Sequence, residues 1–464
     1  MVALWRRMVW GAVFASATAG LGAQGLPPEI EAALARTKVP REAVTLFVAP
    51  VDDLGKARVA HRIDNPVNPA SVAKLVTTYA ALELLGPAYT WSTPVYAEGP
   101  IRDGVLQGNL YIRGLGDPKL VAERLWLLMR RVQGLGIKRV SGDIVLDRSA
   151  FETAPVDAAA FDGEPLRPYN AAPDALLVNY KSVVITFTPA DGQARVHVEP
   201  PLAGVTWPAN VPLAAGDCGD WRTGLRADYT DPLRPRFAGS YPAACGERVW
   251  PIAFADPAAF AVRAVAGMWQ SLGGTVGGQV REGRVPAGLR PVFDVRSPPL
   301  AEAVRDINKY SNNVMAQQLF LTLSLQARGA GTFEGSRDVL RSWWRDRIGG
   351  DPPVVENGSG LSRTDRVTAR QLAQLLALAW KSPLMPELVA SLPVTGLDGT
   401  LRRSTAAGLA HLKSGSLRDV AGIAGYVHGA SGRRYVLVAI ANHSAPSAIR
   451  PLFDVLVDWA ARDS

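Results

Sequence analysis

An apolar, helix-prone segment begins at Asn68-Pro69-Ala70-Ser71-Val72-Ala73-Lys74-Leu75 and stops at Gly86-Pro87. Within it, Ser71 and Lys74 are three residues apart, and residues at that spacing project from the same face of a helix. A serine needs an adjacent base to become a nucleophile, and a lysine supplies it when burial or a nearby positive charge lowers its pKa. The alternative is structural, because serine is a common helix N-cap and a lysine in the first turns is usually solvated. A catalytic role for Ser71 and Lys74 is therefore favoured only if matching catalytic residues occur elsewhere in the chain.

Two further short motifs follow in order, Ser311-Asn312-Asn313 and Lys413-Ser414-Gly415. With Ser71 to Lys74 they match the three-part signature S-x-x-K, S-x-N and K-T/S-G of penicillin-binding proteins and serine β-lactamases. Each motif occurs once, so three matches in this order favour an acyl-transfer site. Serine stands at position 414, where threonine is commoner, and we expect its role to persist because the hydroxyl is retained.

The chemistry of an acyl-enzyme gives each of these residues a task. We expect Ser71 to attack a carbonyl while Lys74 takes its proton. Lys413 adds a second positive charge, which disfavours the protonated form of Lys74 and attracts a substrate carboxylate. Ser311 is placed to relay the proton to the leaving amine, and the amide of Asn313 to hold a peptide-like substrate.

Composition narrows the class of protein. A chain of 464 residues exceeds the usual domain size, and 48% apolar with 20% charged residues is ordinary for a globular protein. The net charge of +8 is spread along the chain without a long basic run, which argues against nucleic-acid binding but is compatible with mild attraction to an anionic cell wall. Because only five histidines occur, without HExxH or GxSxG, we expect no Ser-His-Asp triad, metal or cofactor.

The N-terminus has the layout of a secretory signal peptide. Arg6-Arg7 precedes an apolar run from Met8 to Ala23, and cleavage is expected after Ala19 or Ala23. A membrane anchor is the alternative, but the run is shorter than the roughly 20 residues that span a bilayer. No later stretch has the pattern of a transmembrane helix, so we expect an exported, periplasmic protein.

The chain contains two cysteines, Cys218 and Cys245. In an exported chain an even number favours a disulfide, which would stabilise the fold by roughly 3 to 4 kcal/mol in the chain-entropy model. Two unpaired thiols are the alternative.

Periodicity divides the chain into a split outer domain and a long insertion. Hairpin strands are predicted at 44–51 and 57–63, the motif helix at 71–85, and helices at 300–325, 332–347 and 368–380, followed by β-rich runs at 412–427 and 434–442 and a last amphipathic helix. Between them lie short strands, a helix at 120–135 and a hairpin around Asp191-Gly192. We therefore expect an α/β catalytic domain from 24–86 and 292–464, an inserted domain from 87–160 and 251–291, and a second domain nested at 161–250.

With these motifs, the chain resembles a known family of low-molecular-mass penicillin-binding proteins. Its members are D-alanyl-D-alanine carboxypeptidase/endopeptidases that have a large insertion between the first two motifs. Four further segments support the resemblance, which spans nearly the whole mature chain: Gly114 to Pro118, Tyr169 to Pro173, Gly358 to Arg363 and Leu397 to Leu401.

The resemblance implies both a fold and a site. The fold is a transpeptidase/β-lactamase-like domain, an antiparallel sheet flanked by helices, with two nested, mainly β inserted domains. The oxyanion hole would be the backbone amides of Ser71 and Ser416, with Ser414 and Gly415 lining the substrate site. Arg363 would pair with an anionic group of the substrate side chain. Asp147 is a further candidate for substrate recognition, although a turn carboxylate after a strand is an equal interpretation.

These features predict a periplasmic serine peptidase that acts on peptidoglycan peptides and is acylated by penicillin. A β-lactamase is the rival enzyme, but it needs a deacylating glutamate or tyrosine, and no candidate is placed for that role. A non-catalytic cell-wall-binding scaffold of the same fold is the other rival. The balance of carboxypeptidase and endopeptidase action, the diamino acid of the substrate, and whether the protein is a homodimer stay open.

Overall fold

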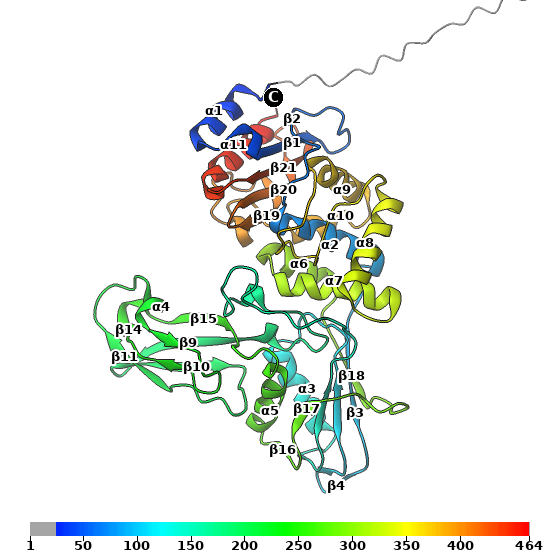
Figure 1. The fold of residues 1–464 in the computed structure, drawn as a ribbon, viewed down its shortest axis with the longest axis vertical. Coiled ribbons are helices and arrows are strands. Elements are labelled where there is room, and N and C mark those ends of the chain that lie inside the picture. The colour runs from blue at the N-terminus through cyan, green and yellow to red at the C-terminus, as the bar shows by residue number, and fades with distance from the viewer. Residues whose placement is uncertain (1–24, 464) are drawn as a thin grey trace, which may run out of the picture.

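The two ends of the chain build one antiparallel sheet. The computed structural model describes residues 25–463, so the expected signal peptide at 1–23 lies outside the described residues. The sheet has the strand order β19-β20-β21-β1-β2 (Figure 1). Its strands are β19 (Ala410–Leu417), β20 (Val420–His428), β21 (Arg434–Asn442), β1 (Val44–Pro50) and β2 (Val59–His61). The hairpin predicted at 44–63 is confirmed, because β1 and β2 pair antiparallel.

Alternation along the strands places helices on both faces of this sheet. In β1, Leu46 and Val48 pack on one side and Phe47 and Ala49 on the other, as the two-residue period of a strand requires. The first side is covered by α1 (Pro28–Thr37) and α11 (Arg450–Ala461). On the second side, α9 (Ala369–Lys381) packs directly on β1, β20 and β21. The same core continues outward through α2 (Lys74–Leu85), α6 (Leu300–Tyr310), α7 (Asn313–Arg328), α8 (Phe333–Arg347) and α10 (Met385–Ser391).

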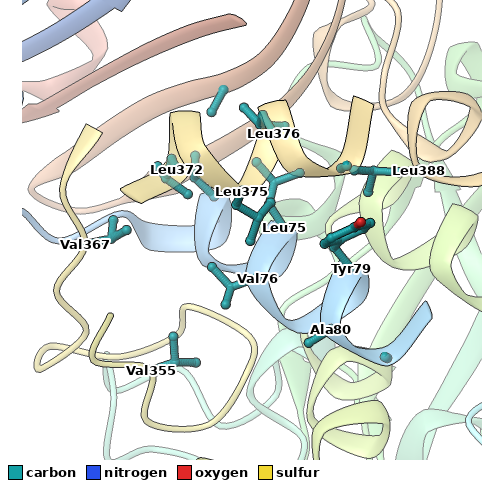
Figure 2. Packing of buried hydrophobic residues seen from close by; sticks show 14 of the residues in the cluster. Leu75, Val76, Tyr79, Ala80, Val355, Val367, Leu372, Leu375, Leu376 and Leu388 are labelled. Carbon is teal, nitrogen blue, oxygen red and sulfur yellow. The ribbon is translucent and has the colours of Figure 1, made fainter. Parts of the chain in front are cut away.

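Helix α2 lies in the middle of this second core. Every residue from Lys74 to Leu82 is buried. Figure 2 shows Leu75 and Tyr79 of α2 beside Leu375 of α9 and Leu388 of α10. A helix that is apolar on all sides belongs in a protein core, so the position of α2 follows from its sequence.

The chain between α2 and α6 forms the inserted region (Figure 1). One sheet has the order β17-β8-β6-β3-β18, a smaller one β16-β7-β5-β4, and a third β14-β11-β10-β9-β15. The strands are β3 (Ser92–Ala97), β4 (Ile101–Arg102), β5 (Val105–Leu106), β6 (Leu110–Arg113), β7 (Arg139–Val140), β8 (Ile144–Asp147), β9 (Ser182–Ala190), β10 (Gln193–Glu199), β11 (Asn210–Ala214), β12 (Ala227–Asp228), β13 (Arg236–Phe237), β14 (Tyr241–Pro242), β15 (Arg248–Ala253), β16 (Thr275–Val276), β17 (Val280–Glu282) and β18 (Phe293–Arg296). The helices are α3 (Ala122–Gly134), α4 (Trp221–Gly224) and α5 (Phe260–Ser271).

The inserted sheets share one hydrophobic cluster, which runs from Val95 to Trp269. Strand β18 pairs with β3, so the inserted sheet reaches Arg296, a few residues beyond the boundary expected at 292. The third sheet, at 182–253, carries the disulfide between Cys218 and Cys245. The sequence-based preference for a disulfide over two free thiols therefore agrees with the structure.

Two segments differ from the sequence-based expectation. The helix predicted at 300–325 is broken into α6 and α7, because Ser311 between them takes a left-handed conformation with φ 57°. The β-rich run at 412–427 is two strands, β19 and β20, which reverse at Arg418-Asp419. Among the described residues, no helix is both long and apolar enough to cross a membrane.

Candidate active site

A tight turn ahead of α2 presents Ser71. The residues Ala70–Ala73 form a 3-10 turn that continues into the helix. The side chain of Asn68 holds this turn in place. Its Oδ1 accepts from Ala70 N at 2.8 Å, and its Nδ2 donates to Ser362 O at 2.9 Å. Asn442 of β21 also accepts from the backbone N of Asn68 at 2.8 Å, which ties the turn to the sheet. The nucleophile candidate is thereby held at the junction of sheet and helix.

Lys74 lies below Ser71 and is fully buried. Its Nζ donates to Ser71 Oγ at 2.8 Å, to Asn313 Oδ1 at 2.7 Å and to Ser359 O at 2.5 Å. Burial lowers the pKa of Lys74 well below its ordinary value, and the nearby charge of Lys413 lowers it further. An amine whose pKa is lowered in this way is a better general base than an ordinary lysine.

The break between α6 and α7 brings Ser311 to the second lysine. Lys413 of β19 is fully buried and its Nζ donates to Ser311 Oγ at 2.9 Å and to Ser414 O at 2.6 Å. Burial lowers the pKa of Lys413 from 10.5 to about 7. Asn312 caps α7 by accepting from Met315 N at 3.0 Å, so the helix restarts directly after Ser311. The left-handed residue therefore aims the serine of the second motif at the lysine of the third.

Strand β19 is the edge strand of the sheet and passes close to the nucleophile turn. A Cβ at Gly415 would lie 2.6 Å from Pro69 O and 3.1 Å from Ser71 N, so only glycine allows this approach. The next residue, Ser416, is exposed, and the hydroxyls of Ser414 and Thr400 are 2.6 Å apart.

A cavity of about 590 Å³ opens above these groups. Its lining includes Ser71, Ser311, Ser414, Gly415 and Ser416. The structure thus brings all three motifs to one cleft, with Lys74, Asn313 and Lys413 buried at its base.

Arg363 and Asp147 lie apart from this cluster. The guanidinium of Arg363 donates to Asp419 at 2.8 Å and stacks 4.5 Å above the ring of Phe161, so it bridges the β19–β20 turn and the inserted region. Asp147 is buried at the end of β8, where it accepts from Ser149 N at 3.0 Å and from Val285 N at 3.0 Å.

These contacts keep the carboxylate of Asp147 within the inserted region, and Asp147 is not part of the cavity lining. These contacts are those of a turn carboxylate, and a role for Asp147 in substrate recognition stays a prediction.

Sequence reasoning missed three contributors. The carbonyl of Ser359 accepts from Lys74, and the carbonyl of Tyr169 accepts from Asn313 Nδ2 at 3.2 Å. Both belong to segments that supported the family resemblance, but a backbone carbonyl leaves no signal in side-chain identity. The third is Asp365, a fully buried carboxylate whose charge raises the pKa of Lys74, while burial raises its own pKa to about 6.

His411 is not part of this arrangement. Its Nδ1 lies 2.8 Å from Nε2 of His428 on the neighbouring strand. The pair is a cross-strand contact, as expected for a strand residue rather than a base.

A buried amine beside a serine hydroxyl, with a second buried lysine and the edge of a strand alongside, is the arrangement of a serine acyl-transfer enzyme. Comparison with known proteins agrees. The D-Ala-D-Ala carboxypeptidase 3 (S13) family matches residues 26–462. The D-alanyl-D-alanine carboxypeptidase of Actinomadura sp. (strain R39) is 32% identical over 412 residues, which cover 82% of this chain and 74% of that protein.

Solved structures show the same fold. Penicillin binding protein 4 (dacB) from Haemophilus influenzae has a TM-score of 0.74 at 21% identity, covering 93% of this chain and 98% of that chain. The same protein complexed with a novel β-lactam has a TM-score of 0.71 at 20% identity, with the same coverage.

The chain belongs to the S13 family of D-Ala-D-Ala carboxypeptidases. It is a serine-type carboxypeptidase of the penicillin-binding class, and the expected transpeptidase-like domain with β-rich insertions is confirmed.

Proposed function

We propose that Ser71 is the nucleophile and Lys74 the general base of a carboxypeptidase that removes the terminal D-alanine from peptidoglycan stem peptides. One observation carries this assignment: Lys74 Nζ is fully buried yet lies 2.8 Å from Ser71 Oγ. Its lowered pKa leaves a lone pair for the serine proton.

In the first half of the reaction, Ser71 Oγ attacks the carbonyl carbon of the penultimate D-alanine as its proton passes to Lys74. The backbone amides of Ser71 and Ser416 stabilise the oxyanion. The carbon–nitrogen bond then breaks, and the leaving amine receives a proton through Ser311. Water attacks the resulting ester in the second half, which releases the shortened peptide and restores the serine.

Lys413 acts through its charge. Its hydrogen bond to Ser311 Oγ orients the proton relay, and when it is protonated its charge adds to burial in lowering the pKa of Lys74. The carboxylate of the substrate binds near Lys413 through the hydroxyls of Ser414 and Ser416, along the strand edge at Gly415. Asn313 hydrogen-bonds to Lys74 and to the carbonyl of Tyr169, and its amide is proposed to bind the peptide backbone of a substrate.

Arg363 is proposed to meet an anionic group on the substrate side chain. Its side chain is about half exposed and its partner Asp419 is more exposed still, so water weakens the pair. A substrate carboxylate can replace Asp419 at small cost.

We further propose that the enzyme acts in the periplasm after its signal peptide is removed, that it also cleaves D-alanyl cross-links, and that β-lactams acylate Ser71. The disulfide supports export, since disulfides form in oxidising compartments. The β-lactam complex of the Haemophilus protein supports acylation.

Fluorescent penicillin tests the nucleophile. We expect the wild-type protein to retain covalent label through denaturing electrophoresis and Ser71→Ala to retain none. Ser342→Ala, an exposed serine on α8 that is not part of the cavity lining, is the matched control and should label normally. Persistent label in Ser71→Ala would refute the nucleophile, and release of D-alanine from a pentapeptide, measured in parallel, tests the reaction itself.

A further inference from the structure

The cleft continues well beyond the catalytic motifs. The cavity that contains Ser71 extends to a cluster of three exposed arginines, Arg402, Arg403 and Arg450, which we call the arginine cluster. Its floor is apolar where Ile423 lies beneath it. A single leaving alanine does not need this length of cleft.

The protein holds the arginine cluster in place. Arg402 and Arg403 lie on the loop before Ser404, and Asp454 of α11 accepts from Ser404 Oγ at 2.6 Å and from Thr405 Oγ1 at 3.1 Å. Asp454 also lies four residues after Arg450 on α11, so one face of this helix supplies an arginine and fixes the loop that carries the other two.

Positive charge dominates this end of the cleft. Within residues 25–463, none of the three guanidinium groups forms an ion pair with a carboxylate, whereas the nearby Asp454 is engaged by the loop. Arg450 donates to Ser416 Oγ at 3.4 Å, which connects the arginine cluster to the strand edge beside the nucleophile. This end of the cleft therefore favours an occupant that carries negative charge.

The position of the arginine cluster relative to Ser71 indicates which part of a substrate it meets. Lys74, Asn313 and the carbonyl of Tyr169 lie on one side of the nucleophile, where the acyl donor peptide is proposed to bind. The arginine cluster and Ser416 line the cavity, whereas Asn313 and Tyr169 are not part of its lining. The carboxylate of the leaving alanine is proposed to bind at Ser416, which Arg450 contacts, so the leaving group would lie on the side of the arginine cluster.

We propose that the arginine cluster binds the carboxylates of the leaving strand of a peptide cross-link, an inference that rests on the proposed endopeptidase activity. When a D-alanyl cross-link is cut, the leaving group is a second stem peptide with several carboxylates, instead of one alanine. Guanidinium groups pair with carboxylates in a planar, two-pronged geometry, so three of them in one cleft suit a polyanionic peptide. The apolar floor accommodates the methylene chain of the cross-linking residue.

The test compares two substrates, a D-alanyl-D-alanine pentapeptide and a cross-linked peptide dimer. In the double variant Arg402→Gln/Arg403→Gln, the ratio of kcat/KM for the dimer to that for the pentapeptide should fall by about tenfold, mainly through KM. Arg433→Gln, an exposed arginine on the β20–β21 turn outside the cavity, is the matched control and should leave the ratio unchanged.

A peptide dimer whose leaving-strand carboxylates are amidated tests directly whether the arginine cluster binds those carboxylates. Wild-type enzyme should cleave it about tenfold less efficiently than the free acid, and the double variant should no longer distinguish the two dimers. An unchanged ratio in the double variant, equal losses on both substrates, or no cleavage of the dimer by wild-type enzyme would overturn the inference. Failure of the proposed function gives a different result, because wild-type enzyme would then release no D-alanine and bind no fluorescent penicillin.

Discussion

Replacing Lys413 by methionine should stabilise the protein while abolishing its chemistry. The lysine is fully buried, and burial lowers its pKa from 10.5 to about 7. At pH 7 this drop corresponds to about 4 kcal/mol of lost folding free energy, at about 1.4 kcal/mol for each tenfold change in proton affinity. Losing the hydrogen bonds to Ser311 Oγ and Ser414 O costs about 1 kcal/mol each. The variant should therefore gain about 2 kcal/mol.

The pH dependence of this gain identifies its cause. Because the lysine binds its proton more tightly in the unfolded chain, a lowered folded-state pKa destabilises the native state. The whole of this penalty is present below about pH 7. The penalty shrinks between about pH 7 and 10.5 and vanishes above. The stability advantage of Lys413→Met should consequently disappear as the pH rises through that window.

Two measurements check this prediction. Denaturant unfolding from pH 6 to 10 gives the stability difference, and hydrogen exchange in α2 and β19 shows whether it resides in the catalytic domain. Lys381→Met, an exposed lysine at the end of α9, is the control and should change little. Acylation by fluorescent penicillin should fall about a hundredfold or more in Lys413→Met. A variant that is less stable at pH 7, or whose advantage does not change with pH, would contradict the electrostatic reasoning.

Three further outcomes are expected. Asp365→Asn removes a charge that raises the pKa of Lys74, so the acidic limb of the pH profile for acylation should move to lower pH, and an upward movement would exclude this role. Replacing Cys218 and Cys245 by serine opens a loop with a sequence separation of 27, which should lower stability by about 3.5 kcal/mol in the chain-entropy model, measured by denaturation, while penicillin labelling of the folded protein persists. Gly360→Ala should lose acylation, because its Cβ would lie 2.0 Å from the carbonyl of the residue before the nucleophile; normal labelling kinetics would show that the turn adjusts.

The sequence predicted most of the elements whose pattern is local. The motif helix, the first hairpin and the final amphipathic helix all occur where hydrophobic periodicity indicated them. The break at Ser311 was not predictable, because apolar periodicity continues through it and neither glycine nor proline marks it. The contact that Ser311 makes there is tertiary, the bond from Lys413, whereas the cap by Asn312 that restarts the helix is local.

The catalytic site also has features that the sequence predicted and features that it could not predict. Three spaced motifs were sufficient to predict that Ser71, Lys413 and Ser311 meet, since their chemistry requires it. Asp365 could not be found that way, because a buried carboxylate acts through its charge and belongs to no motif. For Asp147 the sequence allowed two interpretations. A single acidic residue after a strand does not distinguish a carboxylate that stabilises a turn from one that binds substrate.

The basicity of Lys74 depends on the apolar character of α2. Burial is the largest cause of the lowered pKa of Lys74, and that burial exists because the helix packs against α9 and α10 on one side and the sheet on another (Figure 2). A half-solvated α2 would avoid the desolvation penalty of Lys74 but would leave a protonated lysine beside Ser71. The hydrophobic run that places this helix in the core is therefore also what makes its serine reactive, which is why the first motif had to lie in an apolar segment.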